Sequence, residues 1–135
     1  MERTSEEKTL GGLTHLAIFF GWLGLIANVV LYIIYRPKSQ FVGGHVKQAL
    51  GLQMLLLVIH ALLALLFGAG VVGGIGLGST IGLGAAVGAT LLGGLLGLVI
   101  AVGAIVLAII AAIKGFQGQE HRHPIVGNWI AGLGN

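Results

Sequence analysis

Three long apolar runs, separated by short polar or glycine-rich stretches, dominate the pattern of the chain. They cover residues 10–35, 48–67 and 86–113. About 20 predominantly apolar residues are enough for a helix to cross a bilayer. The pattern therefore predicts an all-α integral membrane protein, a single membrane domain over 1–135 with three transmembrane helices.

The segments between and around these runs have distinct characters. A polar N-terminal tail covers 1–9, and a basic hinge covers 36–47. Pro37 disfavours the helical conformation of the residue before it, so the first helix is predicted to end there. Ser39 can cap a new helix that runs through Lys47 into the second apolar run.

The second connection, residues 68–85, is apolar and rich in glycine. Nine of the 21 residues from 68 to 88 are glycine. One interpretation is a hairpin or re-entrant loop at the far membrane surface. The other is a fourth crossing with a glycine zipper, because glycines four residues apart share one helix face, where another backbone can approach closely. These glycines are Gly70, Gly74, Gly78 and Gly82.

The placement of the basic residues favours three membrane crossings and one orientation of the chain in the membrane. Three crossings put five basic residues on one side and leave Arg3 and Lys8 on the other, whereas four crossings give no clear bias. Because basic residues concentrate on the cytoplasmic side, we expect the N-terminus outside and the C-terminus in the cytoplasm of the inner membrane. The five are Arg36, Lys38, Lys47, Lys114 and Arg122.

Composition narrows the chemistry further. Only 8% of residues are charged and the mean hydropathy is +1.03, whereas about a quarter of a soluble domain is charged. The chain has no cysteine and no aspartate, and its four glutamates all lie near the termini. Without cysteine, disulfides, thiolate metal sites and cysteine nucleophiles are excluded. Without aspartate or an internal glutamate, conventional catalysis is hard to build, so we expect no enzyme, no cofactor and no metal site. The net charge of +3 favours anionic lipid headgroups as the partner and not nucleic acid.

The hinge and the tail supply candidate interface residues. Basic side chains there can reach headgroup phosphates while their stems lie along apolar surface, so the segment either docks a partner or only anchors the chain in lipid. After Pro124, a short amphipathic helix is predicted to lie on the inner leaflet, with Ile125, Val126, Ile130 and Leu133 on one face. Glu120, His121 and His123 could bind a metal, but they are neighbours in the tail with no second cluster in the sequence, so a solvated hinge is expected there. The candidate interface residues are Arg36, Lys38, Phe41, His45, Lys47 and Trp129.

Three polar residues lie inside the apolar runs. Counted along antiparallel helices, Asn28 and Gln53 come to the same depth, so the two amides are predicted to face each other; a polar pore lining is the alternative. His60 lies about 20 Å from the hinge end of its helix. An ionisable residue inside a membrane is a candidate functional site, here for haem, a quinone or a proton. The alternative is a neutral histidine bonded to a backbone carbonyl or to another subunit.

Two stretches, "THLAIFFGWLG" and "YRPKSQFVGGHVKQALGLQ", carry a resemblance to a known family. The chain resembles a family of small bacterial membrane proteins of unassigned function, distantly similar to a Tic translocon component of the chloroplast inner envelope. The resemblance implies a small helical bundle associated with other membrane proteins. It rests on His15-Leu16, Arg36-Pro37-Lys38, Phe41, His45, Lys47-Gln48-Ala49-Leu50, Gln53, Gly115 and His123-Pro124.

Three functions are compatible with these observations. The first is a non-enzymatic accessory or scaffold subunit of a larger membrane complex or a homo-oligomer. The second is a transport or translocation component that forms an oligomer. The third is a redox subunit that binds haem or quinone through His60.

Overall fold

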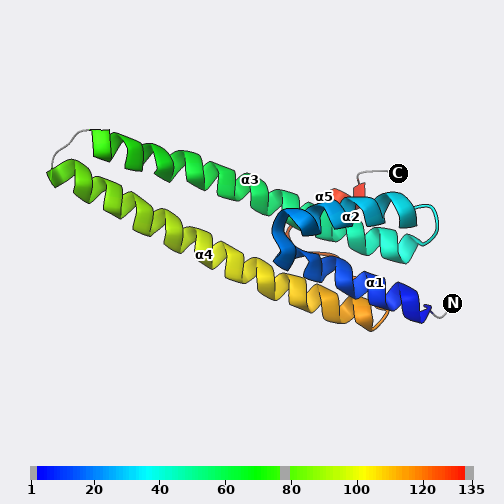
Figure 1. Ribbon diagram of the computed structural model, residues 1–135. Helices are drawn as coiled ribbons and strands as arrows, with labels where there is room; N and C mark the ends of the chain where they lie inside the picture. Colours follow the sequence, from blue (N-terminus) through cyan, green and yellow to red (C-terminus); the bar gives the residue numbers. More distant parts are fainter. Residues whose placement is uncertain (1–2, 77–79, 133–135) are drawn as a thin grey trace. The chain divides into compact units, whose positions relative to one another are not determined.

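The structure, a computed structural model, describes residues 3–76 and 80–132; for 129, 131 and 132 only the backbone is described. Every regular element in these ranges is a helix. The elements are α1 (Ser5–Leu16), η1 (Ala17–Phe20), α2 (Gly21–Tyr35), α3 (Gln40–Gly76), α4 (Thr80–Phe116) and α5 (Gly127–Gly132) (Figure 1).

Three helical stretches are long and apolar enough to cross a membrane by length and composition. They are Ser5–Tyr35, Gln40–Gly76 and Thr80–Phe116, which confirms the predicted fold class. The alternative of a fourth crossing is wrong, because α3 continues to Gly76 and α4 begins at Thr80. The predicted connection 68–85 is therefore helical over 68–76 and 80–85. Gly78 lies outside the described residues.

The chain divides into two compact units. Unit 1 comprises Met1–Met54 and Ala104–Asn135, and unit 2 comprises Leu55–Gly103. Helices α3 and α4 each contribute to both units. All charged side chains belong to unit 1, whereas the sequence of unit 2 contains one titratable residue, His60.

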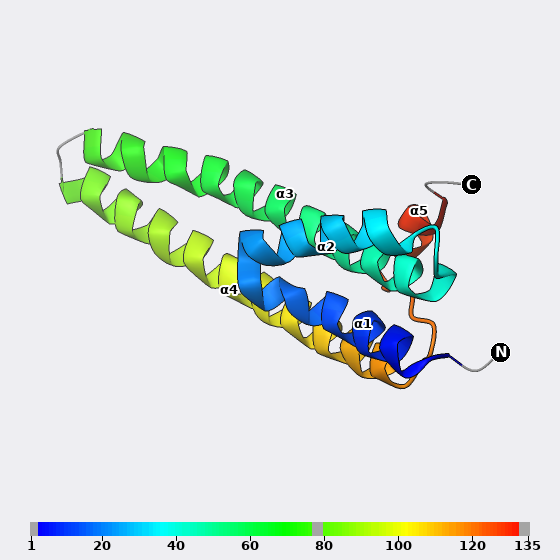
Figure 2. The same ribbon diagram turned by 45° about the vertical axis from the view of Figure 1, so that its right-hand side comes forward.

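In unit 1 the first apolar stretch doubles back on itself. The 3-10 turn η1 ends at Gly21, whose φ of +54° is a left-handed conformation that favours glycine. Helix α2 then runs antiparallel beside α1 (Figures 1 and 2). At the open end, the Tyr35 hydroxyl donates to Glu6 Oε1 at 2.8 Å. The single straight helix predicted for 10–35 is therefore a helical hairpin.

The hairpin changes the expected sidedness of the chain. Arg3 and Glu120, predicted on opposite membrane faces, form an ion pair at 3.4 Å. Ser39 donates from its hydroxyl to Glu7, so the start of α3 lies beside the start of α1. The N-terminal segment, the hinge and the segment after α4 thus lie at one end of unit 1. This proximity differs from the expectation that the N- and C-terminal segments lie on opposite sides of the membrane.

Local sequence signals explain where the helices begin. Thr4 accepts from the Glu7 backbone N–H, and the Glu7 carboxylate accepts from Thr4 N–H, which makes a capping box that starts α1 inside the predicted polar tail. Ser39 Oγ accepts from Val42 N–H at 3.3 Å, as expected of a cap for α3.

Small residues let the segments of unit 1 approach closely. Phe41, Val42 and Val46 of α3 form its apolar core. The end of α4 lies against α1, where a Cβ on Gly115 would come within 2.6 Å of the Gly12 backbone nitrogen. Inside the hairpin, a Cβ on Gly24 would collide with the Ala17 carbonyl oxygen.

In unit 2, α3 and α4 pack through glycine and alanine. A Cβ on Gly74 would meet the Gly82 carbonyl oxygen and lie 3.0 Å from Ala86 Cβ, and one on Gly70 would lie 3.1 Å from Ala89 Cβ. The four-residue glycine repeat is thus divided between two helices, and Gly74 and Gly82 face each other across the helix pair.

We expect Gly24→Ala to lower the stability of the hairpin. Alanine usually stabilises a helix relative to glycine by about 0.5–1 kcal/mol, but the new methyl overlaps Ala17, and overpacking costs about 1–3 kcal/mol. Thermal unfolding in detergent, followed by circular dichroism, measures the effect. Gly44→Ala is the matched control, because no atom lies within 4 Å of that Cβ position. Equal melting temperatures for the two variants would contradict the close contact.

The hairpin also predicts the accessibility of single cysteines, which can be introduced into this cysteine-free chain. Ser5→Cys, Lys38→Cys and Gln117→Cys replace exposed residues. All three are expected to react with a membrane-impermeant maleimide from the same face of oriented vesicles. Labelling of the Ser5 variant from the opposite face would disprove the arrangement.

Candidate functional site

Four of the five histidines of the chain converge within unit 1. His15 comes from α1, His45 from α3, and His121 and His123 from the segment between α4 and α5. The ring centroid of His15 lies 5.3 Å from those of His45 and His123 and 6.2 Å from that of His121. The centroids of His121 and His123 are 5.0 Å apart. We call these four residues the histidine cluster.

Hydrogen bonds order two of the rings. His45 Nε2 lies 3.0 Å from the Gln119 carbonyl oxygen, and His45 Nδ1 lies 3.0 Å from His15 Nε2. A carbonyl can only accept, so His45 Nε2 carries the hydrogen and, in the neutral ring, His45 Nδ1 accepts from His15 Nε2–H. His15 Nδ1 is then an unprotonated nitrogen with a free lone pair.

Gln48 holds the tail segment against α3. Its side-chain oxygen accepts from the His123 backbone N–H at 3.1 Å, and its amide donates to the Gly127 carbonyl at 3.4 Å. His123 is consequently only 2% exposed. This burial, with the neighbouring His121 and His45, lowers the pKa of His123 to about 4. Burial also lowers the pKa of His121, so both rings are neutral near pH 7.

Several nitrogens of the cluster are buried without a hydrogen-bond partner. They are His15 Nδ1, His121 Nε2 and both ring nitrogens of His123. An unsatisfied buried polar atom costs about 1–3 kcal/mol. Each of these three histidines has a ring nitrogen that could bind a ligand.

The structure corrects the interface assigned to the hinge. Phe41 and His45, predicted at the membrane surface, are each 3% exposed because α1 and the tail cover them. Phe41 packs under the Arg3 guanidinium at 4.8 Å. Arg36 and Lys38 are exposed, with their charges 5.6 and 5.7 Å from the rings of Tyr32 and Tyr35, and Lys47 is half-buried.

The tail is also buried more deeply than expected. Val126 and Ile130 are each 4% exposed, and both lie against Gly51 of α3, so this apolar face covers protein and not lipid. Of the residues predicted in a solvated hinge, Glu120 is exposed and His121 half-buried, so the prediction is wrong for His123 alone, which is buried. Ile125 is exposed. Leu133 and the side chain of Trp129 lie outside the described residues.

The amides of Asn28 and Gln53 meet, as their matching depths predict. Asn28 Nδ2 donates to Gln53 Oε1 at 3.0 Å and also lies 3.0 Å from the Thr14 carbonyl oxygen. Asn28 is fully buried. The pair therefore joins both arms of the hairpin to α3.

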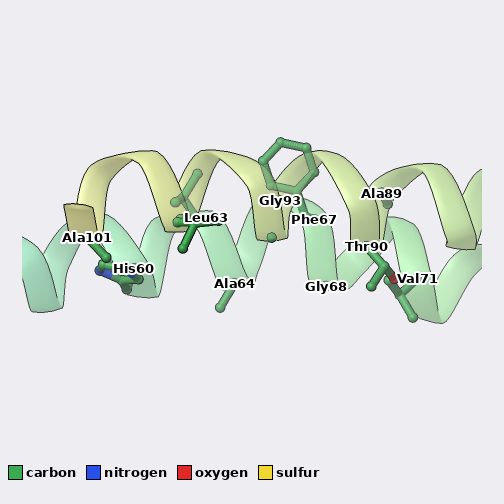
Figure 3. A pocket seen from close by; sticks show the side chains of 13 residues that line it. His60, Leu63, Ala64, Phe67, Gly68, Val71, Ala89, Thr90, Gly93 and Ala101 are labelled. Carbon is green, nitrogen blue, oxygen red and sulfur yellow. The ribbon is translucent and has the colours of Figure 1, made fainter. Parts of the chain in front are cut away.

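His60 belongs to unit 2. Its Nδ1 donates to the Leu56 carbonyl oxygen at 2.8 Å, which is the backbone-bonded alternative predicted for this residue. The ring lies at one end of an apolar groove of about 680 Å³ between α3 and α4, with Thr90 and Val71 at the other end (Figure 3).

Sequence reasoning missed the histidine cluster because it placed His15 at the far end of a straight helix. Once the first segment doubles back, His15 and His45 come to the same level. The available signal was the scarcity of polar residues: in a chain this apolar, buried histidines need one another or a ligand.

Comparison with known proteins places the chain in a family. Residues 6–130 match the magnetosome magnetite crystal formation protein family (MamF/MmsF), and the chain belongs to it. The expected small bacterial membrane-protein family is thereby identified, whereas similarity to the chloroplast Tic component is not shown. No curated protein and no solved structure matches the chain.

Removing the Gln48 side chain should release the tail. Gln48→Ala leaves the His123 N–H and the Gly127 carbonyl without their partner, at a cost of about 1–3 kcal/mol per buried group. We expect faster tryptic cleavage after the exposed Arg122. Gln40→Ala, at an exposed position on the same helix, is the control. Cleavage at the wild-type rate in Gln48→Ala would argue against this attachment.

Acidification should loosen the tail in a defined pH window. The pKa of His123 is about 4 when folded and about 6.5 when exposed, so the unfolded state binds more protons between these values. Stability is then complete above about pH 6.5 and falls by up to about 1.4 kcal/mol per pH unit towards pH 4. Melting temperatures at pH 7 and pH 5 test this. The difference should shrink in His123→Gln, and an undiminished difference would exclude His123 as the titrating group.

Proposed function

We propose that this member of the magnetosome magnetite crystal formation protein family is a non-enzymatic, multi-pass protein of the magnetosome membrane that acts as an accessory or scaffold subunit. The observation that carries the proposal is the family match over residues 6–130. The three membrane-capable helical stretches agree with a role in a membrane.

The distribution of chemical groups supports a structural role. The four glutamates and all basic side chains belong to unit 1, and two of these acids are engaged with Tyr35 and Ser39. Unit 2 presents large apolar side chains outward, among them Leu65 and Leu66 at about 70% exposed. A surface of this kind suits lipid chains and the helices of other membrane proteins.

Unit 2 also offers places where a second helix can approach. Gly84 and Gly88 lie one turn apart on α4, and nothing within 4 Å would meet a Cβ at either position. Small residues four apart allow close backbone contact between membrane helices. The exposed charges of Arg36 and Lys38 suit anionic headgroups at the surface.

The two other functions have less support. A translocation role, including one like that of the Tic component, would need polar groups along a path, but the Asn28 and Gln53 amides bond each other. A two-histidine haem at His60 would need a second histidine, and no other histidine occurs in the sequence of unit 2. The scaffold function is therefore the one proposed.

Deletion of the gene in a magnetite-forming bacterium should change the number or the size of the crystals seen by electron microscopy. The wild-type gene is expected to restore them. Crystals that are unchanged after deletion would contradict the proposed function.

The scaffold role makes a separate prediction for a double variant, Gly84→Leu with Gly88→Leu. The variant should keep its fold, because nothing in the chain lies within 4 Å of a Cβ at either position. The complex should lose its partner subunits, so its native mass measured in nanodiscs should be smaller than that of the wild type. Ala85→Leu adds the same kind of side chain to the same turn, on another face, and should leave the mass unchanged. A double variant of wild-type native mass would argue against assembly through this face.

A further inference from the structure

The histidine cluster contains three rings whose nitrogens lack hydrogen-bond partners. His15 and His123 are each 2% exposed, and the unpaired nitrogens are buried in both. His121 contributes a third such nitrogen, Nε2. Buried polar groups without partners are rare in native proteins, and a bound ion is one way in which such groups are satisfied.

The spacing of the three rings fits a shared ligand. A nitrogen bonds a divalent transition metal at about 2.0–2.1 Å, which puts each imidazole centroid about 3.2 Å from the ion. Two rings at a tetrahedral angle then have centroids about 5.3 Å apart, and wider angles extend this to about 6.5 Å. The centroid separations of His15, His121 and His123 are 5.0, 5.3 and 6.2 Å.

The fourth ring, that of His45, fixes the tautomer of His15. Through the Gln119 carbonyl and His45, the hydrogen of His15 is fixed on Nε2, which leaves the Nδ1 lone pair free and buried. Metal-binding histidines usually donate their second nitrogen to a fixed acceptor in this way. His45 is thus a positioning residue for His15.

We propose that His15, His121 and His123 bind one divalent first-row transition-metal ion, with His45 holding His15 in the required tautomer. An all-imidazole ligand set suits ions of this class and not magnesium or calcium, which prefer oxygen. The site is independent of the proposed scaffold function, because it depends on these side chains alone.

Binding requires the rings to turn. Among the described residues, no three histidine, cysteine, aspartate or glutamate side chains are arranged to hold an ion as they stand. His121 and His123 lie in the non-helical segment between α4 and α5, so their rings can reorient without breaking a helix. The Lys114 charge acts on His121 and opposes a second cation, whereas His15 Nδ1 already offers a lone pair.

The test uses the full-length, untagged chain in detergent, stripped with a chelator and titrated with Co²⁺, whose visible d–d absorption reports nitrogen ligands. We expect a visible absorption band that saturates at one Co²⁺ per chain. Zn²⁺ should displace the Co²⁺ and remove the band, whereas excess Mg²⁺ should not. No saturable band, or displacement by Mg²⁺, would overturn the proposal.

Variants assign the site to these residues. His121→Ala and His15→Ala should abolish the band, and His45→Ala should weaken Co²⁺ binding about 10–100-fold. His60→Ala, a histidine of unit 2, should leave the titration unchanged. Circular dichroism confirms that each variant keeps its helices, and His121→Asn provides a smaller change should the alanine variant lose them. Full binding in His121→Asn, or loss of binding in His60→Ala, would place the metal elsewhere.

Discussion

The turn at Gly21 is the constraint on which the arrangement of unit 1 depends. Because φ there is positive, α2 returns beside α1 instead of extending the first helix. Tyr35 then reaches Glu6, Ser39 reaches Glu7, and α3 starts at the level of α1. A straight helix would separate these groups by the length of the segment, and none of the contacts could form.

The polar residues of the apolar runs are then explained by their partners. Water is absent from a hydrocarbon layer, so each polar side chain there must be satisfied within the protein. Gln53 binds Asn28 and joins α3 to the hairpin. Gln48 binds the backbone on either side of Pro124, and His45 binds both α1 and the tail. His45, Gln48 and Gln53, which are among the residues that carried the sequence resemblance, thus join the segments through hydrogen bonds.

The sequence predicted the helical class, the three membrane-capable stretches, the cap at Ser39 and the Asn28–Gln53 pair. These features depend on local hydropathy, on a single capping residue or on depth along a helix, all of which can be read from one chain. The hairpin could not be read in this way. A glycine within an apolar run is ordinary in membrane helices, and only its φ distinguishes Gly21 from its neighbours. The burial of Phe41 and His45 follows in part from the hairpin, which places α1 against α3, whereas the burial of His123 follows from the Gln48 hydrogen bonds that hold the tail.

The same dependence explains why the candidate site lies in unit 1. A cluster of histidines needs segments that are distant in sequence to meet, and it needs neighbours that exclude water without supplying hydrogen bonds. The hairpin, the start of α3 and the tail meet both needs, with Val126 and Ile130 sealing the tail onto Gly51. Unit 2 consists of two helices packed through small residues, and its one histidine bonds its own helix. Among the described residues, the histidines whose rings lie against one another therefore all belong to unit 1, whereas His60 of unit 2 bonds a carbonyl of its own helix.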